Sequence, residues 1–376
     1  PYPTNAPISL GDLERLYPAM SARCKNDPEL AEKARAAVKD LQAGRPGFRA
    51  LWRHFVDLSI AAIKADFAVL GVSWDLWLGE SDSQAEIPAM LEDLKSRGIT
   101  TLSEGATVIS LDPIAKADTP PLLLVKSDGG YLYGTTDLAA LRARVVQGAR
   151  RVLYVADRRQ SLHFAQVFQG ASKAGYLADA TGGCPARAEH VPFGTVNGKD
   201  GKPYKTRDGG VMRLGVLLSE ALDHAAQRLD ENGMGKDLPP DERTAVASQV
   251  AVAAIKFADL CNPRVGDYVF DLEKFTLFEG KTGPYLLYAA VRMKSILRKA
   301  AERSFMPGVL LEPSDAERPL ILKLSALPET LERAAQESAP NLLCDWAYDL
   351  AGAFSTFYQT SNVLREEDAA RRGAWL

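Results

Sequence analysis

The stretch "RVLYVADRRQSLHFAQVFQGASKAG", residues 151–175, decides how the middle of the chain folds. Its first seven residues, 151–157, are a nearly continuous apolar run, as a strand buried in a parallel sheet requires. The amphipathic pattern behind them predicts a helix, and "HVPFGTV" at 190–196 predicts the next strand. This order predicts a doubly wound sheet, and such sheets bind ligands at the carboxyl ends of their strands.

The segments before this unit mix helices with short strands. Residues 8–66 and the segment "IPAMLEDLKSRG" have apolar residues at helical spacing. Short apolar runs predict strands in "FAVLGV" (67–72), "ATVISL", "PLLLVK" and "YLYG" (131–134), and residues 127–130 form a hairpin signal before the last of them. From about residue 214 onward the pattern is almost wholly helical. The expected fold class is therefore α/β plus all-α.

Composition sets limits on the class of protein. The chain has 376 residues with 46% apolar and 25% charged residues, which is the ordinary globular range. A net charge of −3 argues against a protein whose whole surface is positively charged to bind nucleic acid, although local basic patches remain compatible with this charge. Four cysteines without C-x-x-C spacing predict a reduced cytoplasm and no metal site. No apolar run approaches the roughly 20 residues that span a bilayer, so we expect no membrane partner.

A tyrosine and an acid mark the segment "YLYGTTDLAA", residues 131–140. Tyr133 precedes Asp137 by four residues, at the junction between a predicted strand and a predicted helix. Asp137 at this place is either the N-cap of the helix or a carboxylate that faces a ligand.

Two further segments carry groups that suit a ligand. Gln160 and His163 follow the strand at 151–157, and the alternative for them is a place beside a helix cap and a satisfied histidine. The loop "NGKDGKPYKTRDGG" (197–210) follows a strand and combines glycines with basic side chains, which suits phosphate unless it is a solvated turn. Its basic candidates are Lys199, Lys202, Lys205 and Arg207.

Taken together, five segments resemble the arginyl-tRNA synthetase family of the bacterial type. They are "GGYLYGTTDLA", "YVADRRQSLHFAQVF", "HVPFGTVNGKDGKPYKTRDGG", "AIKFADL" and "FEGKTGPYLLYAAVR", and they occur in the family's order over essentially the whole chain. The resemblance implies a class I ligase that uses ATP with Mg²⁺, L-arginine and tRNA-Arg, without a protein-bound metal, as a cytoplasmic monomer. It implies part of a Rossmann-type catalytic domain with a helical insertion, followed by a helical anticodon-binding bundle.

The resemblance also divides the chain and assigns roles. It implies a catalytic part at 1–213 with an insertion at about 1–130, a helical stem-contact region at 214–278, and a truncated anticodon-binding domain at 279–376. The resemblance implies that Tyr133 and Asp137 line the pocket for the arginine side chain. It implies that Gln160 lies near the amino-acid head group and His163 near the adenosine. The backbone at Phe193 and Gly194 would run beside the adenine. A guanidinium forms charged hydrogen bonds with a carboxylate and stacks on an aromatic ring, so these two residue types suit an arginine pocket. The basic loop stands where the family has its "KMSKS" element, whose consensus is absent here, and its lysines and Arg207 would stabilise charge on the α-phosphate.

One element of class I synthetases is missing. They carry an H-x-G-H motif, and none of the four histidines, at 54, 163, 190 and 224, pairs at that spacing. We therefore expect a polypeptide without the first half of the nucleotide-binding fold and without the last helices. Three explanations for such a polypeptide remain open: a fragment that is inactive alone, a naturally truncated paralog, or one part of a split enzyme.

The second class of function is binding without catalysis. Arg292 and Lys299 lie seven residues apart in "VRMKSILRKA", and the helical half could hold tRNA through them or present a solvated helix end. A non-catalytic tRNA-binding or amino-acid-binding paralog is the alternative to the ligase.

Overall fold

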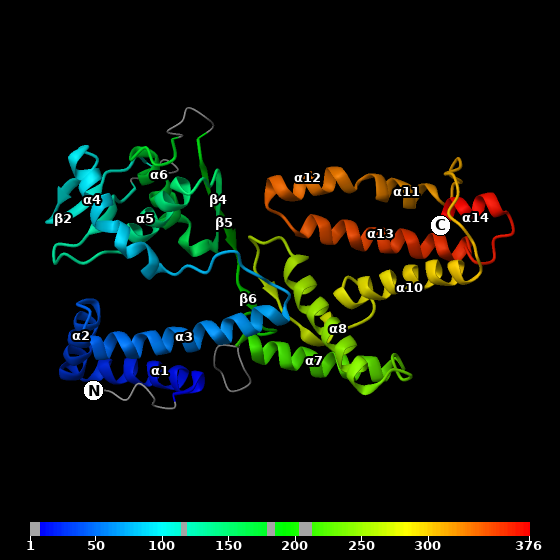
Figure 1. The fold of residues 1–376 in the computed structure, drawn as a ribbon, viewed down its shortest axis with the longest axis horizontal. Helices are drawn as coiled ribbons and strands as arrows, with labels where there is room; N and C mark the ends of the chain where they lie inside the picture. The colour runs from blue at the N-terminus through cyan, green and yellow to red at the C-terminus, as the bar shows by residue number, and fades with distance from the viewer. Residues whose placement is uncertain (1–7, 114–118, 179–184, 203–212) are drawn as a thin grey trace. The chain divides into compact units, whose positions relative to one another are not determined.

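The computed structural model describes residues 8–113, 119–178, 185–202 and 213–376 (Figure 1). The chain divides into two compact units, and each is described by itself. The first comprises Pro1–Asp75 with Arg213–Leu218, and the second comprises Leu76–Met212 with Ser219–Leu376.

Three helices build the first unit: α1 (Leu10–Asn26), α2 (Pro28–Gln42) and α3 (Pro46–Val69). They pack against one another (Figure 1). The side chains of Ser9 and Asp27 cap the first two. The predicted strand at 67–72 is wrong, because α3 continues to Val69 and Gly71 ends it in the left-handed conformation, with φ at +67°. A short apolar run fits a helix end as well as a strand, and here the neighbouring helical turns decide.

The second unit begins with a short helix and an antiparallel sheet. The 3-10 helix η1 (Glu80–Glu86) and α4 (Ile87–Ser96) precede the sheet. Its strands pair in the order β1–β2–β3, where β1 is Thr101–Ser103, β2 is Ala106–Ile109 and β3 is Leu122–Val125. The predicted strand at 131–134 is wrong, since only Tyr131 bridges to Val125 and α5 (Tyr133–Val146) begins two residues later.

The strand–helix–strand unit is confirmed in its order. β4 (Arg151–Asp157) leads through η2 (Arg158–Gln160) into α6 (Ser161–Lys173), and β5 (Arg187–Phe193) pairs with β4 in parallel. The second strand ends at Phe193 instead of running to residue 196, because the extended pairing stops at Gly194. A separate short strand, β6 (Val196–Asn197), follows. In the described part of the chain, β4 and β5 form a two-stranded sheet.

One face of this parallel pair is uncovered. Helix α6 packs on β5, and Val152 is buried, but Leu153 and Val155 are 42% and 69% exposed. Parallel sheets normally have both faces covered, so the expectation of a strand buried on both sides is wrong for the described residues.

A single apolar core joins α4, the antiparallel sheet, α5, β4 and α6. Leu122 of β3 fits against two glycines, Gly134 of α5 and Gly170 of α6, where an added Cβ would lie 2.7 Å from its methyl groups. The fully or nearly fully buried members of this core include Ile87, Met90, Leu94, Ile109, Leu124, Leu138, Leu141 and Val167.

The remainder of the second unit is helical apart from β6 and β7 (Tyr268–Val269), which pair in parallel. Helix α7 (Leu214–Glu231) begins in the segment that groups with the first unit and belongs to the second from Ser219 onward. The other helices are α8 (Pro240–Leu260), α9 (Leu272–Phe275), α10 (Gly283–Glu302), α11 (Arg318–Ser325), α12 (Leu327–Glu337), α13 (Asn341–Thr360) and α14 (Ala369–Trp375). Helix α10 packs on α8 and α13, and α13 also packs on α11 and α12 (Figure 1). Phe354 and Phe357 of α13 are buried in the core between these helices.

No helix in the described ranges combines the length and apolar character that crossing a bilayer requires.

Candidate functional site

The first part of the site is the beginning of α5. Tyr133 is the first residue of this helix and Asp137 the fifth, so the two lie on one face, a turn apart. Buried Thr135 fixes the helix start, because its hydroxyl donates to the carbonyl of Leu124 in β3. The N-cap position belongs to Leu132, so the alternative that Asp137 caps the helix is wrong.

The second part is the turn between β4 and α6. Gln160 ends η2 and is exposed, and His163 lies three residues later in the first turn of α6. The Nε2 atom of His163 lies 2.6 Å from Oδ2 of Asp137, and both side chains are 30% exposed. The structure thus brings together two residues that are 26 positions apart and that the sequence placed in different subsites.

The third part is the end of β5. Phe193 pairs with Asp157, the last residue of β4, and its side chain is 41% exposed. Gly194 follows and comes so close to Gly266 that an added Cβ would lie 2.3 Å from the Gly266 carbonyl oxygen. Only glycine fits there. The carboxyl ends of the two strands, the turn after β4 and the start of α6 therefore carry four of the predicted residues at one edge: Gln160, His163, Phe193 and Gly194.

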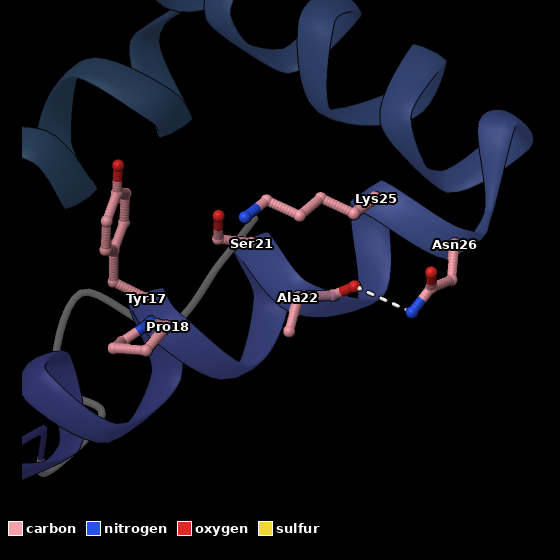
Figure 2. Close-up of a pocket in the computed structure, with 6 residues that line it drawn as sticks. All are labelled: Tyr17, Pro18, Ser21, Ala22, Lys25 and Asn26. Carbon is pink, nitrogen blue, oxygen red and sulfur yellow. Dashed lines mark hydrogen bonds between the residues drawn. The ribbon is translucent and has the colours of Figure 1, made fainter.

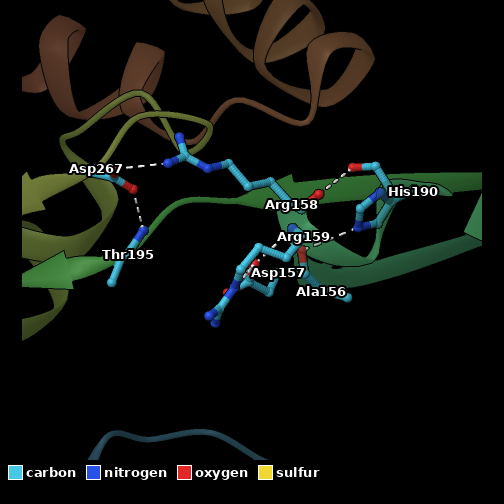
Figure 3. A network of polar contacts seen from close by, with 8 residues as sticks. Ala156, Asp157, Arg158, Arg159, His190, Thr195 and Asp267 are labelled. Carbon is cyan, nitrogen blue, oxygen red and sulfur yellow. Dashed lines mark hydrogen bonds and ion pairs between the residues drawn. The ribbon is translucent and has the colours of Figure 1, made fainter. Parts of the chain in front are cut away.

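A polar network ties this edge to the segment before β7 (Figure 3). Arg158 of η2 forms an ion pair with Asp267, with its Nη2 2.8 Å from Oδ2, and Asp267 also accepts from the backbone N–H of Thr195 at 2.7 Å. Hydrogen bonds from the neighbouring Arg159 lower the pKa of Asp157 to about 2. Sequence reasoning missed the pairing of Arg158 with Asp267, because only the fold brings together residues 109 positions apart. The Gly266-Asp267 dipeptide was the available sequence signal, since it is typical of a turn.

The basic loop is only partly described. Lys199 forms ion pairs with Asp271 and Glu273, at 3.2 Å and 3.4 Å, and these hydrogen bonds raise its pKa. The backbone of Lys202 closes a turn, since its carbonyl accepts from Gly198 at 2.8 Å. Lys205 and Arg207 lie outside the described residues.

The two predicted tRNA-binding residues differ in their surroundings. Arg292 of α10 is half-buried, with its guanidinium 4.5 Å from the centre of the Tyr358 ring on α13. Lys299 is exposed on the same helix, two turns further along.

A separate pocket of about 450 Å³ lies along α1 (Figure 2). Its lining consists of Tyr17, Pro18, Ser21, Ala22, Lys25 and Asn26, and none of the predicted site residues is among them. Among the residues that the structure describes, no group of three or more His, Cys, Asp and Glu side chains is arranged to hold a metal ion.

Comparison with protein families identifies the chain's relatives. Residues 3–272 match the model for the catalytic domain of class I tRNA synthetases (R), and residues 286–375 match the model for the DALR anticodon binding domain. The chain belongs to the arginyl-tRNA synthetase family. Its fold class is accordingly a class I catalytic domain followed by a helical anticodon-binding domain, as predicted.

Curated relatives agree with this family. The chain is 50% identical over 377 residues to an arginine–tRNA ligase of Maricaulis maris and 46% identical over 380 residues to one of Hyphomonas neptunium. Both alignments cover all of this chain but only 63% and 64% of the relatives. The chain thus spans less than two thirds of the length of these members of the arginyl-tRNA synthetase family.

Solved structures of arginyl-tRNA synthetases share the fold. The Plasmodium falciparum protein superposes with a TM-score of 0.75 at 23% identity, covering 96% of this chain and 61% of its own. The Thermus thermophilus protein gives a TM-score of 0.72 at 24% identity, covering 93% and 64%. At this level of identity the likeness supports the fold and carries no residue roles.

Proposed function

We propose that the chain contributes the arginine pocket and part of the nucleotide site of an arginine–tRNA ligase. The reaction would use ATP with Mg²⁺ to activate L-arginine and then transfer it to tRNA-Arg, in the cytoplasm and with the protein as a monomer. The domain division at 213 and 278 and the roles of the predicted site residues belong to this proposal.

The observation that carries the proposal is the Asp137 carboxylate. It lies a turn from the exposed phenol of Tyr133, and its Oδ1 atom has no hydrogen-bond partner within the described residues. A guanidinium is a planar cation whose N–H groups fit a carboxylate, so this carboxylate, whose side chain is 30% exposed, suits the side chain of arginine. Gln160 and the strand ends with Phe193 and Gly194 would hold the head group and adenine, at the sheet edge where α/β folds bind ligands.

The loop residues have a smaller part in the proposal. Lys199 would stabilise charge on the α-phosphate only after leaving Asp271 and Glu273, with which it forms ion pairs. Lys202, Lys205 and Arg207 are proposed for the same role.

Calorimetry with arginine tests the pocket. Asp137→Asn removes the charge and keeps the shape, so we expect arginine affinity to fall about 10- to 100-fold, the range for a hydrogen bond to a charged group. Asp128→Asn is the matched control, because this exposed turn residue lies outside the site and asparagine keeps its turn. Citrulline and lysine should bind poorly to the wild type. Equal arginine affinity in wild type and Asp137→Asn would remove Asp137 from the pocket.

A further inference from the structure

The contact between Asp137 and His163 is the most specific feature of the site. Its 2.6 Å separation joins the first turns of two helices, α5 and α6, and the two side chains are equally accessible. The carboxylate that lies within a turn of the exposed Tyr133 therefore has a hydrogen-bonding neighbour within this chain.

The surroundings keep both groups in place. Thr135 ties the start of α5 to β3, and Phe164, next to His163, is buried with its ring 5.0 Å from Tyr154 and 4.9 Å from His190. The His163 ring meets Phe164 edge-on at 5.2 Å. These contacts fix the backbone segments from which the two side chains project.

The chemistry of the contact leaves capacity for a ligand. An ionised carboxylate accepts about four hydrogen bonds through its two oxygens, and His163 uses one site on Oδ2. Since the carboxylate only accepts, the imidazole must carry its proton on Nε2 to bond it. Oδ1 and the remaining positions on Oδ2 stay available to the fork of a guanidinium.

We propose that His163 is a positioning residue for the arginine pocket, and not a contact to the nucleotide. Its Nε2–H holds Oδ2 of Asp137 so that the carboxylate faces the guanidinium in one orientation. This inference rests on the proposed function, because it assumes that Asp137 receives the arginine side chain. It differs from the role near the adenosine that the sequence resemblance implies for His163.

Binding measurements on the full chain separate the two roles. In His163→Ala the carboxylate loses its hydrogen-bond donor. We expect arginine affinity to fall about ten-fold, as for other residues that orient a ligand-binding side chain, while ATP affinity is unchanged. His163→Gln should recover most of the loss, because the glutamine amide can donate from a similar place. Leu162→Ala, at an exposed neighbour in the same turn, should match the wild type. Loss of ATP affinity with arginine affinity intact in His163→Ala would overturn the proposal and favour the nucleotide contact.

A ligand-free measurement distinguishes failure of this proposal from failure of the proposed function. If the wild type binds no arginine, the arginine pocket fails for this chain, while ¹⁵N NMR of the imidazole still tests the positioning. We expect His163 to be protonated on Nε2 in the wild type, and to lose this preference in Asp137→Asn. A ring protonated only on Nδ1 in the wild type would overturn the positioning role whether or not arginine binds.

Discussion

At the scale of single residues, Glu317 stands out because it is the charged residue that is buried among those the structure describes. It is 7% exposed, and its oxygens accept from Trp375 Nε1 at 2.9 Å, Arg371 Nη1 at 3.1 Å and the backbone N–H of Ser314 at 3.2 Å. Burial raises the pKa of this carboxyl, but the hydrogen bonds from Trp375 and Ser314 and the charge of Arg371 outweigh it, so the pKa is lowered overall. The ionised form thus joins α14 to the start of α11.

We therefore predict that Glu317→Gln lowers the free energy of unfolding by about 1–3 kcal/mol at neutral pH, because the Ser314 N–H loses its acceptor. A carboxyl whose pKa is lower in the folded state stabilises the fold above its unfolded pKa, here about 4.5, and loses this effect as pH falls through the folded value. The gap between wild type and variant should be full above that pH and shrink below it. Urea unfolding at several pH values measures this, with the exposed Glu367→Gln as control. A gap that is constant down to strongly acidic pH would contradict the assignment.

At the scale of elements, the long helices were predictable and the short strands only in part. The predicted strands at 106–111 and 121–126 are confirmed as β2 and β3, whereas those at 67–72 and 131–134 are wrong. Apolar periodicity predicted α4 and α6, and the helical pattern after residue 214 includes α10, because each long helix repeats its own signal over several turns. The runs at 67–72 and 131–134 are too short to carry a period, and the first turns out to end α3 while the second leads into α5. Contacts that only the fold creates decide such cases, as Thr135 shows by bonding to β3.

The candidate site also has a part that the sequence predicted and a part that it could not predict. The rule that ligand groups gather where parallel strands end predicted that Gln160 and His163 lie at the binding edge of the sheet, while Phe193 was assigned to the site by the family resemblance. Spacing along the chain could not predict the pairing of Arg158 with Asp267 or the approach of Gly194 to Gly266, because each joins segments that lie far apart in the sequence. The contact of His163 with Asp137 belongs to this second class.

Helix α10 carries a prediction about tRNA. Lys299 is exposed, so Lys299→Ala should weaken tRNA binding, lower the slope of log affinity against log salt by about one, and leave stability unchanged. Arg292→Ala should in addition lower stability by about 0.5–2 kcal/mol, because its guanidinium packs on the Tyr358 ring. Lys294→Ala, exposed on another side of α10, is the matched control. If Lys294→Ala and Lys299→Ala weaken binding equally, this face of α10 has no particular place in the interface.

At the scale of the whole molecule, two observations bear on catalysis. The uncovered face of β4 presents Leu153 and Val155 to solvent, whereas parallel sheets in α/β proteins are covered on both faces. Among the 376 residues, the four histidines at 54, 163, 190 and 224 form no H-x-G-H element. The family resemblance implies that an H-x-G-H element positions ATP, so we expect these 376 residues to hold the ATP phosphates poorly even where the proposed arginine pocket is present.

We predict that this chain alone does not form arginyl-adenylate. Positioning of the reactants can contribute about 7–11 kcal/mol to lowering a barrier, so loss of the phosphate-holding element should reduce the rate below detection even where arginine still binds. Arginine-dependent exchange of pyrophosphate into ATP measures the step, with a full-length relative assayed beside it as the positive control. Calorimetry with arginine on the same preparation separates a folded, binding-competent chain from a misfolded one. Exchange at the rate of the full-length relative would contradict the prediction and would mean that other residues of these 376 hold the ATP phosphates.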